Sequence, residues 1–215
     1  MKDLSEMTLD ELWQLFPIVL SEHNPEWFVW YDEEKENLLG LLGTLIERID
    51  HIGSTSIPGL LSKPTVDILV QTTNDANTEH IKAMLLSDGW RLMAENNNAL
   101  DFNKGYTPDG FADRVFHLHV RPAGEHDEIY FRDYIATHPD AAAQYAVLKR
   151  SLFPEYKHNR DGYTEAKGEF IKETMKKARD ELNSNSLGLI PIGSKQEIPD
   201  VLMLDAITAH VKLIQ

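Results

Sequence analysis

The sequence predicts an α+β fold with a β-rich middle and a helical C-terminal part. Strand-like segments lie between residues 48 and 120, whereas helical patterns dominate after Gly124. Strands and helices are thus grouped in separate stretches of the chain, and such segregation is typical of α+β rather than α/β proteins.

The composition is that of a globular protein of 215 residues, with 42% hydrophobic and 26% charged residues. We predict a main domain over residues 1–183, followed by an appendage over residues 184–215 that holds one helix.

No apolar run is long enough to span a membrane and no export signal is visible, so we expect a cytoplasmic protein. The absence of cysteine excludes disulfides and cysteine-bound zinc. A net charge of −14 argues against nucleic-acid binding but allows a local basic pocket for a small phosphate ligand.

Two helices are expected before the first strand. Thr8 to Phe16 begins with a capping box, in which Glu11 follows Thr8 by three residues. Asp32 to Ile46 carries leucines at helical spacing. Pro25 to Trp30, between them, is interpreted as a short anchoring segment.

The middle of the chain alternates between apolar and polar residues, as strands do. A turn is expected at Thr107–Gly110, which predicts that the strands on either side of it pair in antiparallel fashion. The predicted strands are Arg48–Ile52, Thr65–Gln71, Trp90–Ala94, Ala99–Tyr106 and Val115–Val120, with a helix at Thr78–Ser87.

Helical patterns then follow one another to the C-terminus. Asn183–Ser186 is interpreted as a linker, and the final helix is expected to pack on the main domain or to mediate dimerisation. The predicted helices are Asp127–Ala136, Pro139–Leu152 and Tyr163–Leu182, with a last one whose apolar stripe contains Val201, Leu204, Ile207, Val211 and Ile214.

The most informative stretch is HIGSTSIPGLLSKPTVDILV, residues 51–70. A strand, a Gly-Ser turn and a short helix beginning near Pro58 would direct several backbone N–H groups at one point, where they suit phosphate oxygens. Gly53 permits close approach of the backbone, and Lys63 adds positive charge. The loop hydroxyls expected to take part are those of Ser54, Thr55 and Ser56.

One carboxylate lies on the strand after this loop. Strand alternation directs Asp67 away from the apolar face formed by Val66, Ile68 and Val70. An acid beside a phosphate site suits a divalent cation, because Mg²⁺ takes oxygen ligands and bridges to phosphates. The alternative interpretation is an ordinary turn with a structural acid.

The same stretch resembles the signature of the GrpB-like family of the nucleotidyltransferase superfamily, which has the DNA polymerase beta-like fold. The resemblance covers about residues 20 to 180 and includes FHLHV (116–120), FRDYIATHPDAAAQYAVLK (131–149) and YTEAKGEFI (163–171) in the same order. It implies a mixed β-sheet flanked by helices and a scaffold that binds nucleotides.

The superfamily pattern is a Gly-Ser turn, two acids one residue apart on the next strand, and a third acid on a later strand. Asp67 matches the first acid, but Leu69 stands where the second is expected and cannot bind a metal. Glu95 and Asp101 are candidates for the third acid by position only. This departure leaves nucleotidyl transfer open.

Two histidines alternate on a later strand and share one of its faces. His117 and His119 could complete a metal site with Asp67, and two imidazoles with a carboxylate suit Zn²⁺, Mn²⁺ or Fe²⁺ better than Mg²⁺. For the protein as a whole we expect a divalent metal, Mg²⁺ or Mn²⁺, with Zn²⁺ as an alternative. Instead, one of them, with His119 as the candidate catalytic residue beside Asp67, could act as a base near neutral pH. The plainer alternative is that both pack under the helices.

Several cations stand out in so acidic a chain. Tyr163 and Lys167 are four residues apart and share a helix face, so with Arg132 and Lys149 they are candidates to bind the phosphate or base of a substrate. Ordinary surface ion pairs are the alternative.

Three functions follow from these observations. The first is a nucleotidyltransferase-like protein that binds a nucleotide or other phosphorylated small molecule through Gly53 and Ser54, and transfers a nucleotidyl group with metal assistance. The second is a catalytically reduced binding module, and the third is a dimeric interaction protein without enzymatic activity.

Overall fold

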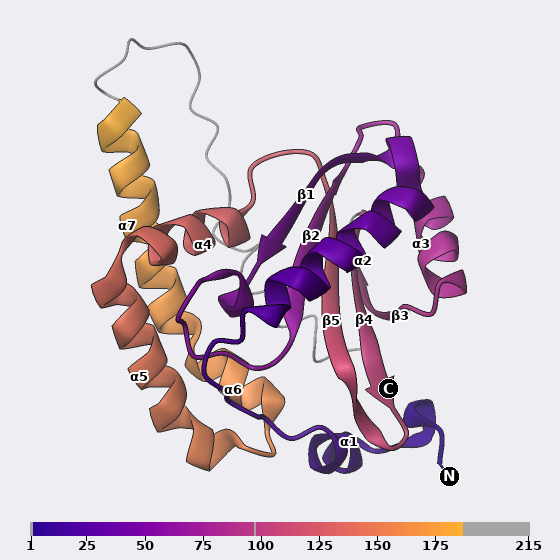
Figure 1. Cartoon of the computed structure of the whole chain (residues 1–215), viewed down its shortest axis with the longest axis horizontal. Helices are drawn as coiled ribbons and strands as arrows, with labels where there is room; N and C mark the ends of the chain where they lie inside the picture. The colour runs from indigo at the N-terminus through magenta and orange to yellow at the C-terminus, as the bar shows by residue number, and fades with distance from the viewer. Residues whose placement is uncertain (1, 97, 187–215) are drawn as a thin grey trace.

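The computed structural model describes residues 2–96 and 98–186, which form a sheet and two groups of helices (Figure 1). The helices are α1 (Leu9–Leu15), α2 (Glu26–Leu42), α3 (Thr78–Ser87), α4 (Asp127–Thr137), α5 (Pro139–Tyr156), α6 (Arg160–Ala166) and α7 (Gly168–Ser186). The strands are β1 (Ile46–Ile52), β2 (Val66–Thr72), β3 (Arg91–Asn96), β4 (Ala99–Thr107) and β5 (Gly110–Pro122). Short 3-10 turns occupy Leu4–Glu6, Gly43–Leu45 and Ser54–Ser56.

The five strands form one mixed sheet in the order β1-β2-β5-β4-β3. Only β2 and β5 are parallel; the other neighbours are antiparallel, including the predicted hairpin of β4 and β5. The parallel pair requires a long crossover, and α3, β3 and β4 lie within it. The crossover brings residues 66–72 beside residues 116–122.

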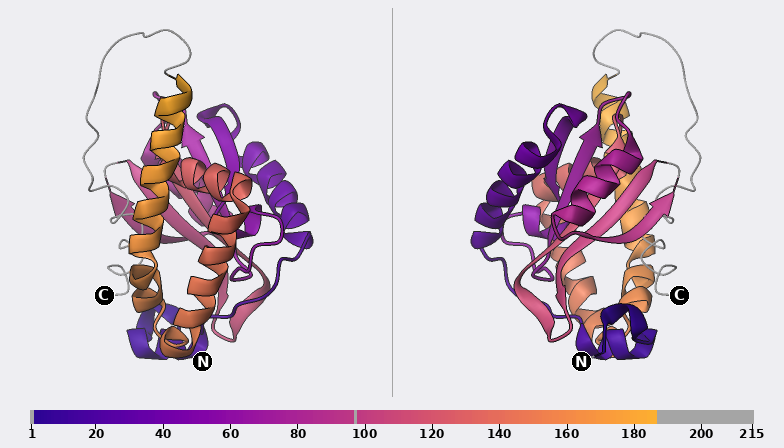
Figure 2. Two further views of the ribbon diagram at one scale, coloured as in Figure 1. Left: turned by 90° about the vertical axis from the view of Figure 1, so that its left-hand side faces the viewer. Right: turned by 90° about the vertical axis from the view of Figure 1, so that its right-hand side faces the viewer.

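The two faces of the sheet are covered differently (Figure 2). Helices α2 and α3 pack on one face, while α4 to α7 gather on the other side, next to β1 and the loop that follows it. Of the helices described, none is both long and apolar enough to cross a bilayer.

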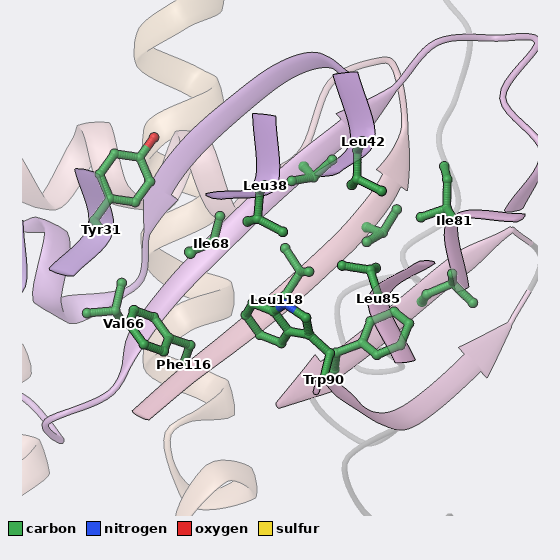
Figure 3. Packing of buried hydrophobic residues seen from close by; sticks show 14 of the residues in the cluster. Tyr31, Leu38, Leu42, Val66, Ile68, Ile81, Leu85, Trp90, Phe116 and Leu118 are labelled. Carbon is green, nitrogen blue, oxygen red and sulfur yellow. The ribbon is translucent and has the colours of Figure 1, made fainter. Parts of the chain in front are cut away.

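The main core lies under α2 and α3 (Figure 3). Alternate residues of β2 point into it, and Val66, Ile68 and Val70 are fully buried there. Leu69 faces the other way, into a small cluster with Ile52 and Ile129. The predicted alternation of β2 is therefore confirmed, and it places Asp67 on the face away from the main core.

The N-terminal prediction was right for α1 and wrong for the start of α2. Thr8 and Glu11 form the expected capping box. Helix α2 begins at Glu26, six residues before the predicted start, because Pro25 already has helical dihedrals and Trp27 and Tyr31 extend its buried stripe. Pro25–Trp30 is thus part of a core helix rather than an anchoring segment.

Three further predictions were wrong. No helix begins near Pro58; a 3-10 turn at Ser54–Ser56 follows Gly53, and Gly59, with φ +77°, does not continue it. The predicted helix Tyr163–Leu182 is divided at Lys167 into α6 and α7. The expected linker Asn183–Ser186 is instead the last turn of α7. The final helix predicted for the appendage lies outside the described residues.

Candidate functional site

The site begins where β1 ends and the chain turns back at Gly53. Gly53 has φ +69°, and a Cβ atom added there would lie 2.9 Å from Cγ of Asp67. The carboxylate of Asp67 therefore lies directly against the loop, as the sequence predicts, and only glycine leaves room for it. The Asp67 side chain keeps 26% of its surface exposed, so a ligand can reach it.

A chain of hydrogen bonds leads from Asp67 across the sheet. His117 Nδ1 donates to Asp67 Oδ1 over 3.1 Å, and Tyr106 donates its hydroxyl to His117 Nε2 over 2.9 Å. Arg160, on α6, donates in turn to the Tyr106 hydroxyl over 2.6 Å. Burial would raise the pKa of Asp67, but the hydrogen bond and charge of His117 lower it to about 2, so the carboxylate is ionised.

Four basic side chains form a cluster next to this carboxylate: Lys63 and Lys167 interact with Asp67 itself, and Lys149 and Arg160 lie near those two lysines. None of them forms an ion pair with a carboxylate of the residues that the structure describes, since the ion pairs found involve other cations. Lys149 instead donates to Ser54 Oγ over 3.1 Å and to the backbone carbonyl of Leu61. The cluster therefore holds positive charge that a single aspartate does not neutralise.

Two of these lysines lie over aromatic rings. Lys149 Nζ is 4.3 Å from the ring centre of Tyr145, and Lys167 Nζ is 4.6 Å from that of Tyr163. Burial and the neighbouring charge lower the pKa of Lys149 to about 7, and burial lowers that of Lys167 to about 8. Burial, followed by the charges of Arg160 and Lys167, holds the pKa of Lys63 well below its usual value.

The three loop hydroxyls have different surroundings. Ser54 Oγ accepts from Lys149 and faces the cluster. The hydroxyl of Thr55 is buried and donates to the Thr65 carbonyl over 3.1 Å, while Ser56 Oγ donates to the Gly53 carbonyl over 2.6 Å. Ser54 is therefore placed to contact a ligand, and the other two stabilise the loop.

No acid stands at the second acidic position of the superfamily pattern, which Leu69 occupies. Leu69 is fully buried, and its register partner on β5 is His119. His119 Nδ1 donates to Asp101 over 2.7 Å, and Arg121 donates to the same oxygen over 2.7 Å. Asp101 is thus engaged within β4 and β5, and Glu95 lies on edge strand β3, where it pairs with Lys82.

The predicted metal ligands do not form a metal-binding set in this arrangement. Both ring nitrogens of His117 are hydrogen-bonded, and Nδ1 of His119 is engaged by Asp101. Among the described residues no group of three or more histidines and carboxylates is placed to hold a metal ion. Asp67 remains able to bind a cation together with a ligand phosphate, and that role stays a prediction.

Arg132 lies apart from the cluster. Its guanidinium binds Asp133 over 2.7 Å and Asp50 over 3.2 Å, which agrees with the ion-pair alternative. Sequence reasoning missed Arg160 and Tyr106, which reach His117 and Asp67 only through the packing of α6 against the β4–β5 hairpin. No local pattern around Arg160 marks it, because its partner is 54 positions earlier in the chain.

A Gly-Ser turn that leads to an acid on the neighbouring strand of a mixed five-stranded sheet defines a nucleotidyltransferase-like fold. The chain belongs to the GrpB protein family, whose model matches residues 17–177.

The relatives agree with this assignment. The UPF0157 protein YqkA of Bacillus subtilis is 32% identical over 160 residues, which cover 73% of this chain and 46% of that protein. A UPF0157 protein of Pseudomonas aeruginosa is 34% identical over 158 residues, covering 72% and 65%. The chain therefore spans between about half and two-thirds of these two relatives. The crystal structure of GrpB from Enterococcus faecalis matches with a TM-score of 0.67 and 26% identity, over 76% of this chain and 99% of that one.

Proposed function

We propose that this protein binds a nucleotide or another phosphorylated small molecule at the Gly53–Ser54 loop. The observation that carries the proposal is the cluster of four basic side chains next to Asp67, which lack ion-pair partners among the described residues of a chain with a net charge of −14. A cation held out of water without a counter-ion is costly, and a bound anion would remove that cost.

A phosphorylated ligand suits this cluster better than a carboxylate does. Several donors converge from different elements: Lys63 after the loop, Lys149 on α5, Arg160 at the start of α6 and Lys167 between α6 and α7. A phosphate chain offers many oxygens and up to two charges per terminal group, enough to occupy donors on several sides. Asp67 would repel the anion directly, so it is placed to bind a cation that accompanies the phosphate.

Calorimetry tests the proposal with inorganic tripolyphosphate and with ATP, each with and without Mg²⁺. Lys149→Gln and Lys167→Gln should each weaken binding about tenfold or more, because each removes one charge-assisted contact. Lys176→Gln, at an exposed position of α7, is the matched control and should bind as the wild type does. If the wild type binds neither ligand, or if the three variants behave alike, the proposal is wrong.

Nucleotidyl transfer is the second candidate. It is favoured by the ionised Asp67 against the Gly53 loop, the position of the first acid in the superfamily pattern. Release of pyrophosphate from nucleoside triphosphates with Mg²⁺ or Mn²⁺ would distinguish an enzyme from a catalytically reduced binding module. An Asp67→Asn variant should lose turnover and keep tripolyphosphate binding.

Two further predictions concern the compartment of the protein and its oligomeric state. Cytoplasmic localisation stays a prediction, and so does self-association. Light scattering of the whole chain and of a chain ending at Ser186 tests the dimer: a fall from dimer to monomer mass would support an interaction role for the appendage.

A further inference from the structure

A cavity lies on the same face of the sheet as Asp67, beyond His117. It has a volume of about 330 Å³ and is enclosed by the N-terminal segment with α1, by β3 and β4, and by the start of α6. That volume is at the lower end of the range for small-molecule sites in proteins. Of the cluster around Asp67, only Arg160 also lines this cavity.

The pairing register of the sheet connects the cavity with the site around Asp67. Asp67, His117, Asn103 and Arg91 are successive partners on β2, β5, β4 and β3. Direct partners share one face of a sheet and are about 5 Å apart, so this polar row extends about 15 Å from the loop into the cavity. A molecule in the cavity would therefore lie beside Asn103, one strand away from His117 and two strands away from Asp67.

The walls of the cavity are mostly apolar, with a few polar groups. Leucines, Trp13, Phe16 and Met93 form the apolar part. Two guanidiniums, those of Arg91 and Arg160, and the amide of Asn103 line it together with one carboxyl group, that of Asp161. Neither guanidinium has a carboxylate within ion-pair distance in the described part of the chain. This combination suits a flat apolar body that carries an anionic group.

Asn103 supplies an independent sign that a ligand is missing. It is only 3% exposed, and its amide nitrogen donates to Met93 Sδ over 2.8 Å, but its Oδ1 has no hydrogen-bond partner among the described residues. A buried acceptor left without a donor is destabilising, and such groups are rare in folded proteins. This oxygen has almost no accessible surface, so an N–H or O–H group of a bound molecule would satisfy it after the Asn103 side chain turns toward the cavity.

We propose that this cavity binds a second small molecule, an aromatic or heteroaromatic acid with an N–H or O–H donor. Its ring packs on Trp13 and Phe16, its donor faces Asn103 Oδ1, and its anionic group faces Arg91 and Arg160. The inference requires no phosphate at the Gly53 loop, so it can succeed or fail separately from the proposed function.

Calorimetry of the full chain with indole-3-carboxylate tests this site, and naphthalene-2-carboxylate is the matched probe without the N–H group. A fragment of this size should bind with a dissociation constant on the order of 1 mM, and the naphthalene probe about tenfold more weakly. No binding of indole-3-carboxylate at about 10 mM would overturn the proposal.

Three variants locate the binding. Asn103→Leu should abolish the preference for indole over naphthalene, Arg91→Gln should weaken both probes, and Leu9→Trp should block both by filling the cavity. Should Asn103→Leu fail to fold, the other two still decide, because Leu9 and Arg91 are only partly buried.

Tripolyphosphate binding by the same variants separates the two sites. Leu9→Trp should leave tripolyphosphate affinity unchanged, and Lys149→Gln should leave indole-3-carboxylate affinity unchanged. If Leu9→Trp and Arg91→Gln both bind indole-3-carboxylate as tightly as the wild type does, the ligand binds outside this cavity and the inference is wrong.

Discussion

At the scale of single residues, Gly53 and Asp67 determine the geometry of the loop. The backbone of Gly53 has a positive φ and is in contact with the Asp67 side chain, so two separate constraints act on one residue. A nearby glycine, Gly59, has a similar positive φ with nothing close to its missing side chain. Gly53 also has ψ −173°, a backbone region that is essentially restricted to glycine, so its substitution meets both backbone strain and the close approach.

We predict that Gly59→Ala lowers the free energy of unfolding by about 1 kcal/mol, the cost of a positive φ for alanine. Gly53→Ala should lower it by about 3 kcal/mol or more, because its Cβ also displaces Asp67. Urea denaturation measures both, and tripolyphosphate binding should weaken only for Gly53→Ala. Equal losses of stability would contradict the close approach.

The buried Lys149 makes stability depend on pH. Its pKa is about 7 in the folded protein against 10.5 as the ordinary value, so between these pH values the unfolded chain binds a proton that the folded chain does not. Stability therefore rises with pH in this window.

We predict that Lys149→Met reduces this rise, by up to about 1.4 kcal/mol per pH unit for one proton. Urea denaturation between pH 7 and about 9 measures the slope, below the range in which tyrosines titrate. Lys176→Met, at an exposed site, should keep the wild-type slope. A slope unchanged in Lys149→Met would show that the folded lysine keeps its usual pKa.

At the scale of elements, β2 lies between two environments. Val66, Ile68 and Val70 belong to the main core. On the opposite face, Asp67 faces the ligand cluster and Leu69 packs against Ile52 and Ile129. Leu69, which stands at the position of the second acid in the superfamily pattern, is thus part of a hydrophobic contact with α4. Replacing Leu69 with an acid would therefore not by itself restore a two-acid site.

We predict that Leu69→Asp lowers the free energy of unfolding by about 4 kcal/mol or more, because it buries a carboxylate among apolar side chains. Leu69→Met, which conserves volume, should cost less than about 1.5 kcal/mol. Urea denaturation and a Mn²⁺ titration followed by electron paramagnetic resonance measure the outcome. A stable Leu69→Asp protein that binds Mn²⁺ stoichiometrically would contradict this account.

At the scale of the whole molecule, a chain with a net charge of −14 concentrates unpaired positive charge at one place. The lowered pKa values of Lys149 and Lys167, about 7 and about 8, make that charge depend on pH near neutrality. A bound anion favours the protonated lysines, so binding and protonation are coupled.

We predict that the affinity for sulfate, whose charge is constant in this range, falls as pH rises from about 7 to about 9. The lysines lose their protons over this interval, and the attraction falls with them. Calorimetric competition against tripolyphosphate at each pH measures the effect. An affinity for sulfate that is constant or rises with pH would exclude these lysines as its ligands.

The sequence by itself determined the local features of this protein. Strand alternation placed Asp67 on the face opposite Val66 and Ile68, the Thr107–Gly110 turn paired β4 with β5, and Thr8 with Glu11 capped α1. Each of these depends on residues close together in the chain, where spacing alone sets the geometry.

Only the tertiary structure decided what surrounds Asp67. The parallel pairing of β2 with β5 brought His117 to it from 50 positions away, and the packing of α5 and α6 brought Lys149 to Ser54 and Arg160 to Tyr106. It also paired His119 with Asp101 and Arg132 with Asp50. Contacts between distant segments depend on how whole elements pack, and no local spacing encodes them.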